Sequence, residues 1–319
     1  MPAAHSHTIE VLENEIGARL DALLAERLGI GRRAVLRLLD RTRVNGHREP
    51  KSMRLRSGDR IEILPGTTGE APEALRVMRS TTGVLVIDKP AGLPTLSLAG
   101  QDEDTLAARV AAFDPGCREA GAPLESGLVQ RLDTGTSGLI LAARNADAWR
   151  ALREQIAGHE LQKTYLCLVA GTLAGDQTIA TPIGQHRKSR RRMIALSHEA
   201  PPERYRTQVA ESRMTVLGRA GNGTFVRVAT STGARHQVRV HLASIGHPIV
   251  GDTLYGGPDL SDTYYGGAAL ADAPGHCLHA ESIRWRDPDS GHSEFEELAP
   301  PTWWEQAAGG VLPLAPAQP

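Results

Sequence analysis

From Val84 to Trp304 the chain consists of short apolar segments separated by turn-forming residues, and this spacing limits the folds open to it. The segments predict strands at Val84–Ile87, Leu139–Ala143, Thr164–Val169, Val209–Val216, Thr224–Thr230 and Cys277–Trp285. Helices are predicted only near Leu106–Ala112, Ala146–Ala157 and Arg239–Ser244. Gly218 to Gly223 predicts the loop of a hairpin. Many strands with few helices indicate an α+β domain and not a doubly wound sheet.

The N-terminal part predicts a separate small domain. Leu20, Leu23, Leu24 and Leu28 form an apolar stripe at helical spacing, and a second helix is predicted from Arg32 to Asp40. A strand entering an Asn-Gly turn follows at 44–46, and an alternating strand at 60–63. Residues 65–80 have the composition of a linker. We therefore expect a disordered leader over 1–8, a small α/β domain over 9–64, a larger domain over 81–305 and a disordered tail over 306–319.

Charge is distributed unevenly, although the net charge is only −1. Between Glu15 and Leu64 there are 12 basic and 7 acidic residues, whereas the rest of the chain carries 24 basic and 30 acidic ones. A second basic cluster comprises Arg187, Lys188, Arg190, Arg191 and Arg192. Such an uneven distribution of charge predicts surfaces that bind phosphate. For either cluster, the alternative is a basic face that is only solvated.

The composition also bears on the compartment. No apolar run approaches the roughly 18 to 20 residues that span a bilayer, and the N-terminus has no basic start or apolar stretch of a secretory signal. The cysteines, Cys117, Cys167 and Cys277, are odd in number and far apart, which favours reduced thiols over a disulfide framework. We expect a cytoplasmic protein.

The stretch "GLVQRLDTGTSGLILAARN", Gly127 to Asn145, places one acidic residue on a polar turn between apolar elements. Asp133 follows Arg131 and precedes small residues. A carboxylate on a loop between rigid elements is a common arrangement for a functional group. The alternative is a turn residue that bonds its own backbone, and the local pattern by itself favours that alternative.

A second polar stretch, "STGARHQVRVHLASIGHPIVGDTLYGG", runs from Ser231 to Gly257. His236 and His241 are five residues apart, which does not put them on one helix face as a two-histidine metal site requires. His276 and His279 are too close together in sequence for a four-ligand zinc site, so strand positions explain them better.

These two stretches, with "VIDKPAGLPT" before them and "LQKTYLCLV" between them, resemble the RluA-type pseudouridine synthases, in the same order over about 200 residues. The preceding run "RLDALLAERLGIGRRAVLRLLDRTRVNG…RLRSGDRIEIL" resembles the small S-four RNA-binding module over roughly fifty residues. The resemblance implies a mixed, largely antiparallel sheet with a central cleft, an activity that isomerises uridine to pseudouridine in folded RNA, and no metal or organic cofactor.

The resemblance also implies residue roles. Asp133 matches the catalytic aspartate, Tyr165 the aromatic residue that stacks on the target base, and Arg239 the arginine that pairs with the carboxylate. Arg131 matches the arginine that fills the space of the extruded nucleotide. Further RNA contacts are expected from Gln130, His236, Gln237, Arg32, Arg33, Arg37, Lys51 and Arg54.

The chain departs from the family pattern at two places. Gln130 stands where the signature has His, which predicts altered target choice without loss of chemistry. Gly233-Ala234-Arg235 stands where many members have Gly-Arg-Thr, so the contacts of the basic residue near the cleft rim are in doubt.

Two other functions stay open at the level of sequence. A nucleoside or glycoside hydrolase would need a second carboxylate, which Asp252 could supply in space. An RNA-binding protein with a silent catalytic domain is the other alternative. We expect a monomer whose partner is ribosomal RNA, with transfer RNA as the second candidate and no membrane.

Overall fold

The structure is a computed structural model that describes residues 7–27, 39, 42–63, 74–96, 104–121, 125–196, 206–260, 275–302 and 304. The chain divides into two compact units, Met1–Ala74 with Leu96–Arg109, and Leu75–Thr95 with Val110–Pro319. Within the described ranges, every helix is too short or too polar to cross a bilayer.

The first unit contains a three-stranded antiparallel sheet in the order β1 (His7–Glu10), β3 (Arg60–Ile63), β2 (Thr42–Val44), together with η1 (Glu13–Glu15) and α1 (Leu20–Arg27). Leu20, Leu23 and Leu24 of the predicted stripe are buried against the sheet. Asn45 and Gly46 both have positive φ, as the predicted turn requires. The predicted disordered leader, 1–8, overlaps β1, since His7 and Thr8 pair with β3 and so belong to a strand. The predicted helix 32–40 lies outside the described residues apart from Leu39.

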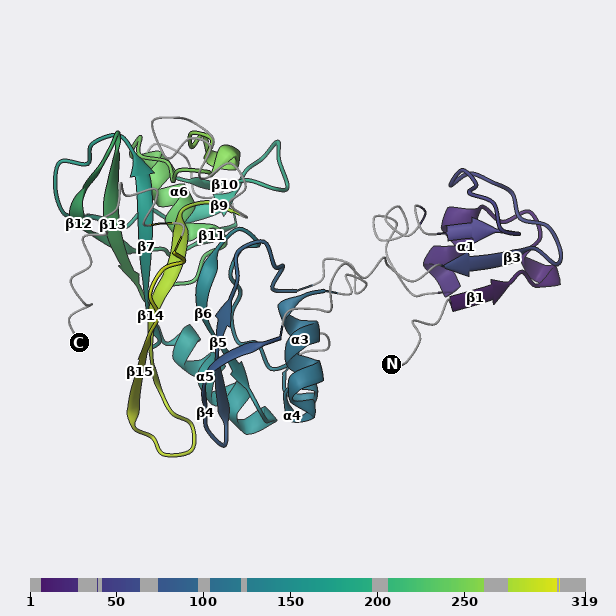
Figure 1. The fold of residues 1–319 in the computed structure, drawn as a ribbon, viewed down its shortest axis with the longest axis horizontal. Helices are drawn as coiled ribbons and strands as arrows, with labels where there is room; N and C mark the ends of the chain where they lie inside the picture. The colour runs from purple at the N-terminus through teal and green to yellow at the C-terminus, as the bar shows by residue number, and fades with distance from the viewer. Residues whose placement is uncertain are drawn as a thin grey trace. The chain divides into compact units, whose positions relative to one another are not determined.

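The second unit is built on a nine-stranded sheet, which confirms the predicted mixed, largely antiparallel architecture. Its order is β4 (Arg76–Ser80), β5 (Val84–Lys89), β6 (Ser137–Ala143), β14 (Leu278–Arg286), β7 (Gln162–Ala170), β13 (Gly223–Thr230), β12 (Ser212–Ala220), β8 (Gln177–Ile179), with β15 (Ser293–Glu297) also paired to β14. Figure 1 shows β12, β13, β7 and β14 side by side and the long β14–β15 hairpin. The β6–β14 pair is parallel, and the other strand pairs of this sheet are antiparallel.

Helices and a small second sheet complete the unit. They are α4 (Pro115–Glu119), α5 (Ala146–Ala157), α6 (Gln237–Ser244), η4 (Thr253–Tyr255), and a sheet of β9 (Ile183–Gln185), β10 (Met193–Ala195) and β11 (Thr207–Gln208). The boundary between the units falls within α3 (Leu106–Phe113), after Arg109. α5 is capped by the Asn145 side chain and packs Ala148 and Leu152 into a core with Leu141 and Trp285. This core holds in place the strands that follow the two polar loops, 131–136 and 275–277.

One row of paired residues positions the polar loops. Gly138 of β6 pairs with Ala280 of β14, Ala280 with Tyr165 of β7, and Tyr165 with Val228 of β13. Because β6 and β14 are parallel, the segments that precede them, 131–136 and 275–277, meet at the same end of the sheet. Gly138 has φ 113°, and a Cβ there would lie 2.3 Å from the Ala280 carbonyl oxygen, so only glycine fits at this crossing.

Three predicted boundaries need correction. β4 occupies the end of the predicted linker 65–80 because it pairs with β5; residues 64–73 lie outside the described part. The strand predicted at 209–216 begins at Ser212, where pairing with β8 starts, and Val209 is 76% exposed. The predicted hairpin between β12 and β13 is confirmed, but its turn is only Gly221–Asn222, since β12 continues to Ala220 past a bulge. The predicted tail 306–319 lies outside the described residues.

Candidate active site

The site is centred on the carboxylate of Asp133, in the loop before β6. Nη1 of Arg239 donates to Oδ2 of Asp133 at 2.6 Å, so the side chain does not form the backbone-bonded turn that the local sequence favours. Among the described residues Oδ1 has no hydrogen-bond partner, and Nε2 of His236 lies 3.6 Å from it. The side chain is 27% exposed. Arg239 therefore holds Oδ2, whereas Oδ1 is open in the sense that no described residue donates a hydrogen bond to it.

Arg239 is itself held by a second carboxylate. Its Nε and Nη2 donate to the two carboxylate oxygens of Asp252 at 2.7 and 2.8 Å, a bidentate pair. The Asp252 side chain is fully buried, and that of Arg239 is 8% exposed. One cation between two carboxylates leaves a single negative charge, and the open oxygen of Asp133 is where a substrate can meet it.

The charges keep Asp133 ionised. Burial alone would raise the pKa of Asp133, but two facing groups outweigh it and lower that pKa below its usual value: His236, which is protonated in the acid range where the carboxyl titrates, and Arg239. Burial likewise tends to lower the pKa of Arg239, whereas the hydrogen bonds to Asp252 and the charge of Asp133 raise it overall. Burial lowers the pKa of His236 and of His276 to about 4, so both imidazoles are neutral near pH 7.

His236 lies directly before α6 in the left-handed region, with φ 57° and ψ 23°. Its Nδ1 lies 2.7 Å from the Tyr255 hydroxyl oxygen, which accepts a hydrogen bond from the backbone N–H of Met193 at 2.9 Å. The guanidinium of Arg239 lies over the Tyr255 ring at 5.1 Å. A left-handed conformation in a non-glycine residue is costly and is typical of functional sites.

Buried polar groups fix the loop that carries Asp133. Lys89, fully buried at the end of β5, donates through Nζ to the carbonyls of Pro90, Leu93 and Thr134 at 2.8, 2.7 and 3.3 Å. The Thr95 hydroxyl donates to the Leu132 carbonyl at 2.5 Å and accepts from the Leu132 amide. On the other side, Nε2 of His276 lies 3.0 Å from the Thr136 hydroxyl. The backbone on both sides of Asp133 is thus tied down.

The other predicted site residues take different positions. Tyr165 is 9% exposed on β7, and burial followed by the charge of Asp133 raises its pKa, so its phenol stays protonated. Arg131 is exposed. Both amide atoms of Gln130 are buried without a hydrogen-bond partner among the described residues.

Gln237 calls for a correction. Its amide is buried and bonds Thr232, Ala234, Glu211, Ser212 and Thr230. With both amide atoms committed to the protein, its role is to anchor the start of α6, and we withdraw the RNA contact expected of it.

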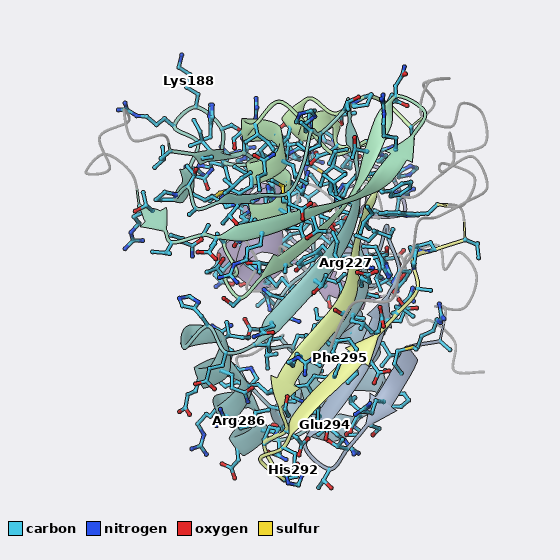
Figure 2. All side chains as sticks on the ribbon, turned by 90° about the vertical axis from the view of Figure 1, so that its left-hand side faces the viewer. Lys188, Arg227, Arg286, His292, Glu294 and Phe295 are labelled. Carbon is cyan, nitrogen blue, oxygen red and sulfur yellow. The ribbon has the colours of Figure 1, made fainter. Side chains whose placement is uncertain are left out.

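The second basic cluster forms the connection between β9 and β10. Arg187, Lys188, Arg190, Arg191 and Arg192 are all exposed, and Figure 2 shows Lys188 projecting from the body of the molecule. The guanidinium of Arg192 lies 5.7 Å from the centroid of the Tyr255 ring. The same ring contacts Arg239, so the basic connection adjoins the carboxylate site.

In the first unit, Lys51 and Arg54 are exposed, and Arg54 donates to the Gly17 carbonyl at 2.7 Å. Arg32, Arg33 and Arg37 lie outside the described residues. His236 and His241 face different partners, since the His241 ring contacts the Ser212 hydroxyl and the Thr181 carbonyl. Nowhere in the described ranges do three or more His, Cys, Asp or Glu side chains gather as metal ligands.

From the sequence, Asp252 was assigned a role only in the hydrolase alternative, and Tyr255, Lys89 and Thr136 were assigned none. The signal for the first two was the run "GDTLYGG", where one acid and one aromatic residue stand between glycines. Gly257 is needed there because a Cβ would lie 2.0 Å from the Ile249 carbonyl oxygen. Lys89 carried a weaker signal, a lysine at the end of a continuous apolar strand.

Fold and site together define a domain built on a mixed sheet, with the ionised Asp133 carboxylate held by a buried arginine. Residues 83–244, about half of the chain, match the family described as RNA pseudouridylate synthase. The "Ribosomal large subunit pseudouridine synthase D" of Xanthomonas campestris pv. campestris is 33% identical over 88% of this chain and 85% of its own. The chain belongs to the RNA pseudouridine synthase family, a family of isomerases.

Other relatives agree with this assignment. The enzyme of the same name from Nitrosomonas europaea is 31% identical over 90% of this chain and 83% of its own, and "Ribosomal large subunit pseudouridine synthase C" of Salmonella typhi is 31% identical over 78% and 79%. The solved structure of human RNA pseudouridylate synthase domain containing 1 superposes with a TM-score of 0.56 at 22% identity, covering 74% of this chain and 87% of that one. This structural likeness supports the fold.

Proposed function

We propose that this enzyme converts a uridine of large-subunit ribosomal RNA to pseudouridine, with Asp133 as the essential carboxylate acting on a flipped-out nucleotide. The observation that carries the proposal is an ionised carboxylate with Oδ2 bound to Arg239 and Oδ1 open. Ribosomal RNA is proposed as the substrate because the relatives named above are ribosomal large subunit pseudouridine synthases.

The chemistry suits a single carboxylate. The reaction breaks the bond between ribose and N1 of uracil, turns the base and rejoins it through C5, whose proton is released. Asp133 serves as a nucleophile at the ribose or as a base on a ribose proton, and both roles need the ionised form. Opposite charges about 4 Å apart attract by roughly 4 kcal/mol at an effective dielectric of 20, so Arg239 favours that form.

The partly buried position of Asp133 supports the proposal of a flipped nucleotide. A carboxylate within a folded domain cannot reach a stacked uridine, and extruding the base costs a few kcal/mol. Stacking on an aromatic side chain returns about 1 to 3 kcal/mol per base, and Tyr165 is the aromatic residue proposed to provide it. Arg131, exposed two residues before Asp133, is proposed to fill the vacated space in the RNA.

Two basic surfaces are proposed to hold the RNA backbone: the β9–β10 connection, and an S-four module in the first unit that presents Lys51 and Arg54. Deleting residues 1–70 should weaken RNA affinity and flatten its dependence on salt, because fewer counterions are released. Replacing Arg187, Lys188, Arg190 and Arg191 with alanine should act in the same sense, with the slope falling by about 0.7 to 0.9 per lost phosphate contact. Unchanged affinity at every salt concentration would leave these surfaces merely solvated.

The structure bears on the hydrolase alternative. Asp252 is fully buried and both of its carboxylate oxygens bond Arg239, so it does not offer a second acid or base to a glycosidic bond. The test is to incubate the enzyme with large-subunit ribosomal RNA and, separately, transfer RNA, then map pseudouridines and assay free uracil. We expect pseudouridine in the ribosomal RNA without uracil release. Uracil release would support a hydrolase, and RNA binding without either product would support a silent catalytic domain.

A further inference from the structure

His236 was expected to touch RNA, but its surroundings indicate a different use. Its side chain is 9% exposed and lies between the Tyr255 hydroxyl and the carboxylate of Asp133. The two rings meet edge to face, with centroids 5.7 Å apart at 82°. A left-handed backbone is unfavourable for a residue other than glycine, so these contacts hold His236 in a conformation that it would not otherwise prefer.

The contacts of Tyr255 determine which nitrogen of His236 carries the proton. The Tyr255 oxygen accepts the amide hydrogen of Met193, and the phenol has a single proton of its own to donate. Among the described residues, Nδ1 of His236 at 2.7 Å is the acceptor within reach of that proton. Since the imidazole is neutral near pH 7, Nδ1 accepts from Tyr255 and the ring proton lies on Nε2.

Nε2–H therefore faces Oδ1, the open oxygen of Asp133, at 3.6 Å. This separation is longer than a hydrogen bond, and catalytic contacts of this kind tighten when substrate binds. Nη1 of Arg239 donates to the other oxygen at 2.6 Å. The contacts from Arg239, on α6, and from His236, the residue before α6, together set the orientation of the carboxylate. Asp133 also interacts electrostatically with Lys89, Tyr165, Tyr255 and His276. His236 itself is acted on by Asp252 and Arg235.

We propose that His236, fixed in its Nε2–H form by Tyr255, is a positioning residue that orients Oδ1 of Asp133 towards the ribose of the flipped nucleotide. The proposal rests on the proposed function, because it presupposes that Asp133 is the reacting group. It separates two tasks within one site: Arg239 keeps the carboxylate charged, and His236 sets its direction.

The test compares His236→Ala, His236→Gln and Tyr255→Phe in the full chain, measuring single-turnover rate, RNA dissociation constant and the pH dependence of the rate. We expect His236→Ala to lose about tenfold or more in rate with RNA affinity nearly unchanged. Its rate should fall at a higher pH than that of the wild type on the acid side, because the variant lacks the imidazolium that His236 forms in acid and that lowers the pKa of Asp133 there. His236→Gln should recover part of the rate, because its amide can donate from near the Nε2 position. Tyr255→Phe should show a smaller loss of the same kind.

His241→Gln is the matched control, because it removes a buried imidazole from the same helix whose ring contacts Ser212 and Thr181. It should cost stability while the rate of the folded enzyme and its pH profile stay unchanged. Wild-type rates in the three test variants, with Asp133→Asn inactive, would overturn the positioning role alone. Activity in Asp133→Asn would instead overturn the proposed function. A loss confined to RNA affinity would make His236 an RNA contact and also overturn the proposal; if His236→Ala does not fold, His236→Gln and Tyr255→Phe decide.

Discussion

Replacing Asp252 with Asn tests whether the buried ion pair with Arg239 supports both the fold and the site. The change keeps the shape of the side chain but removes a fully buried charge that accepts two hydrogen bonds, at 2.7 and 2.8 Å. Removing one partner of a buried ion pair costs about 3 to 5 kcal/mol, a large share of the roughly 5 to 15 kcal/mol that stabilises a typical domain. Arg239 also loses its anchor, and misplacement of a catalytic contact by about 1 Å can cost roughly a hundredfold in rate.

A second pair in the same unit provides the control. Arg227 donates to both oxygens of Glu281 at 2.7 and 2.8 Å, with the carboxylate 4% exposed, and Figure 2 shows Arg227 well apart from Lys188 and the β9–β10 connection. Glu281→Gln should lower stability by a similar or smaller amount, because Glu297 also acts on Arg227. It should leave the single-turnover rate unchanged.

The assays are urea unfolding for stability and single-turnover pseudouridine formation, at a temperature where both variants are folded. We expect Asp252→Asn to lower both the stability and the single-turnover rate, and Glu281→Gln to lower the stability only. A loss of less than about 1 kcal/mol for Asp252→Asn would refute the energetic argument. Equal rates for the two variants would refute the claim that Asp252 holds the site through Arg239.

Three further predictions concern other residues. Burial lowers the pKa of Lys89 to about 7 from 10.5, so the unfolded chain binds a proton that the folded chain loses above pH 7. The stability of the wild type relative to Lys89→Met should therefore rise by about 2 kcal/mol from pH 7 to 9 in urea unfolding, and a flat difference would contradict this. Gln130→His should keep the rate and change the preference among RNA targets; an inactive wild type that this change activates would refute the prediction. Gly138→Ala should lower the free energy of unfolding by about 3 kcal/mol or more, because the added Cβ would lie 2.3 Å from the Ala280 carbonyl oxygen. Thermal unfolding measures this loss, and a near-neutral effect would show that the β6–β14 crossing can adapt.

The fold was largely predictable where local pattern and packing agree. The helix α5 has the predicted bounds, Ala146–Ala157, and the predicted strand Leu139–Ala143 lies within β6. Short segments such as β8 and β11 were missed, since two or three residues carry no period. β4 was read as linker because its exposed, alternating residues gain their structure from pairing with β5.

The site was predictable in its residues but only partly in its arrangement. The motifs pointed to Asp133 and Arg239, which lie 106 positions apart and meet at 2.6 Å. No spacing rule could show that Asp252 holds the far side of Arg239, because that contact depends on the tertiary fold. Gln237 shows the opposite case: it is a polar residue of the same motif as Arg239, but its amide forms hydrogen bonds inside the protein.

The most direct measurement concerns the carboxylate itself. Large-subunit ribosomal RNA labelled with tritium at C5 of uridine releases the label when C5 becomes the glycosidic carbon. Asp133→Asn keeps the size of the side chain while removing its charge, so we expect it to bind the RNA and release no tritium above background. Tritium release by Asp133→Asn at the wild-type rate would contradict the assignment of the chemistry to this carboxylate.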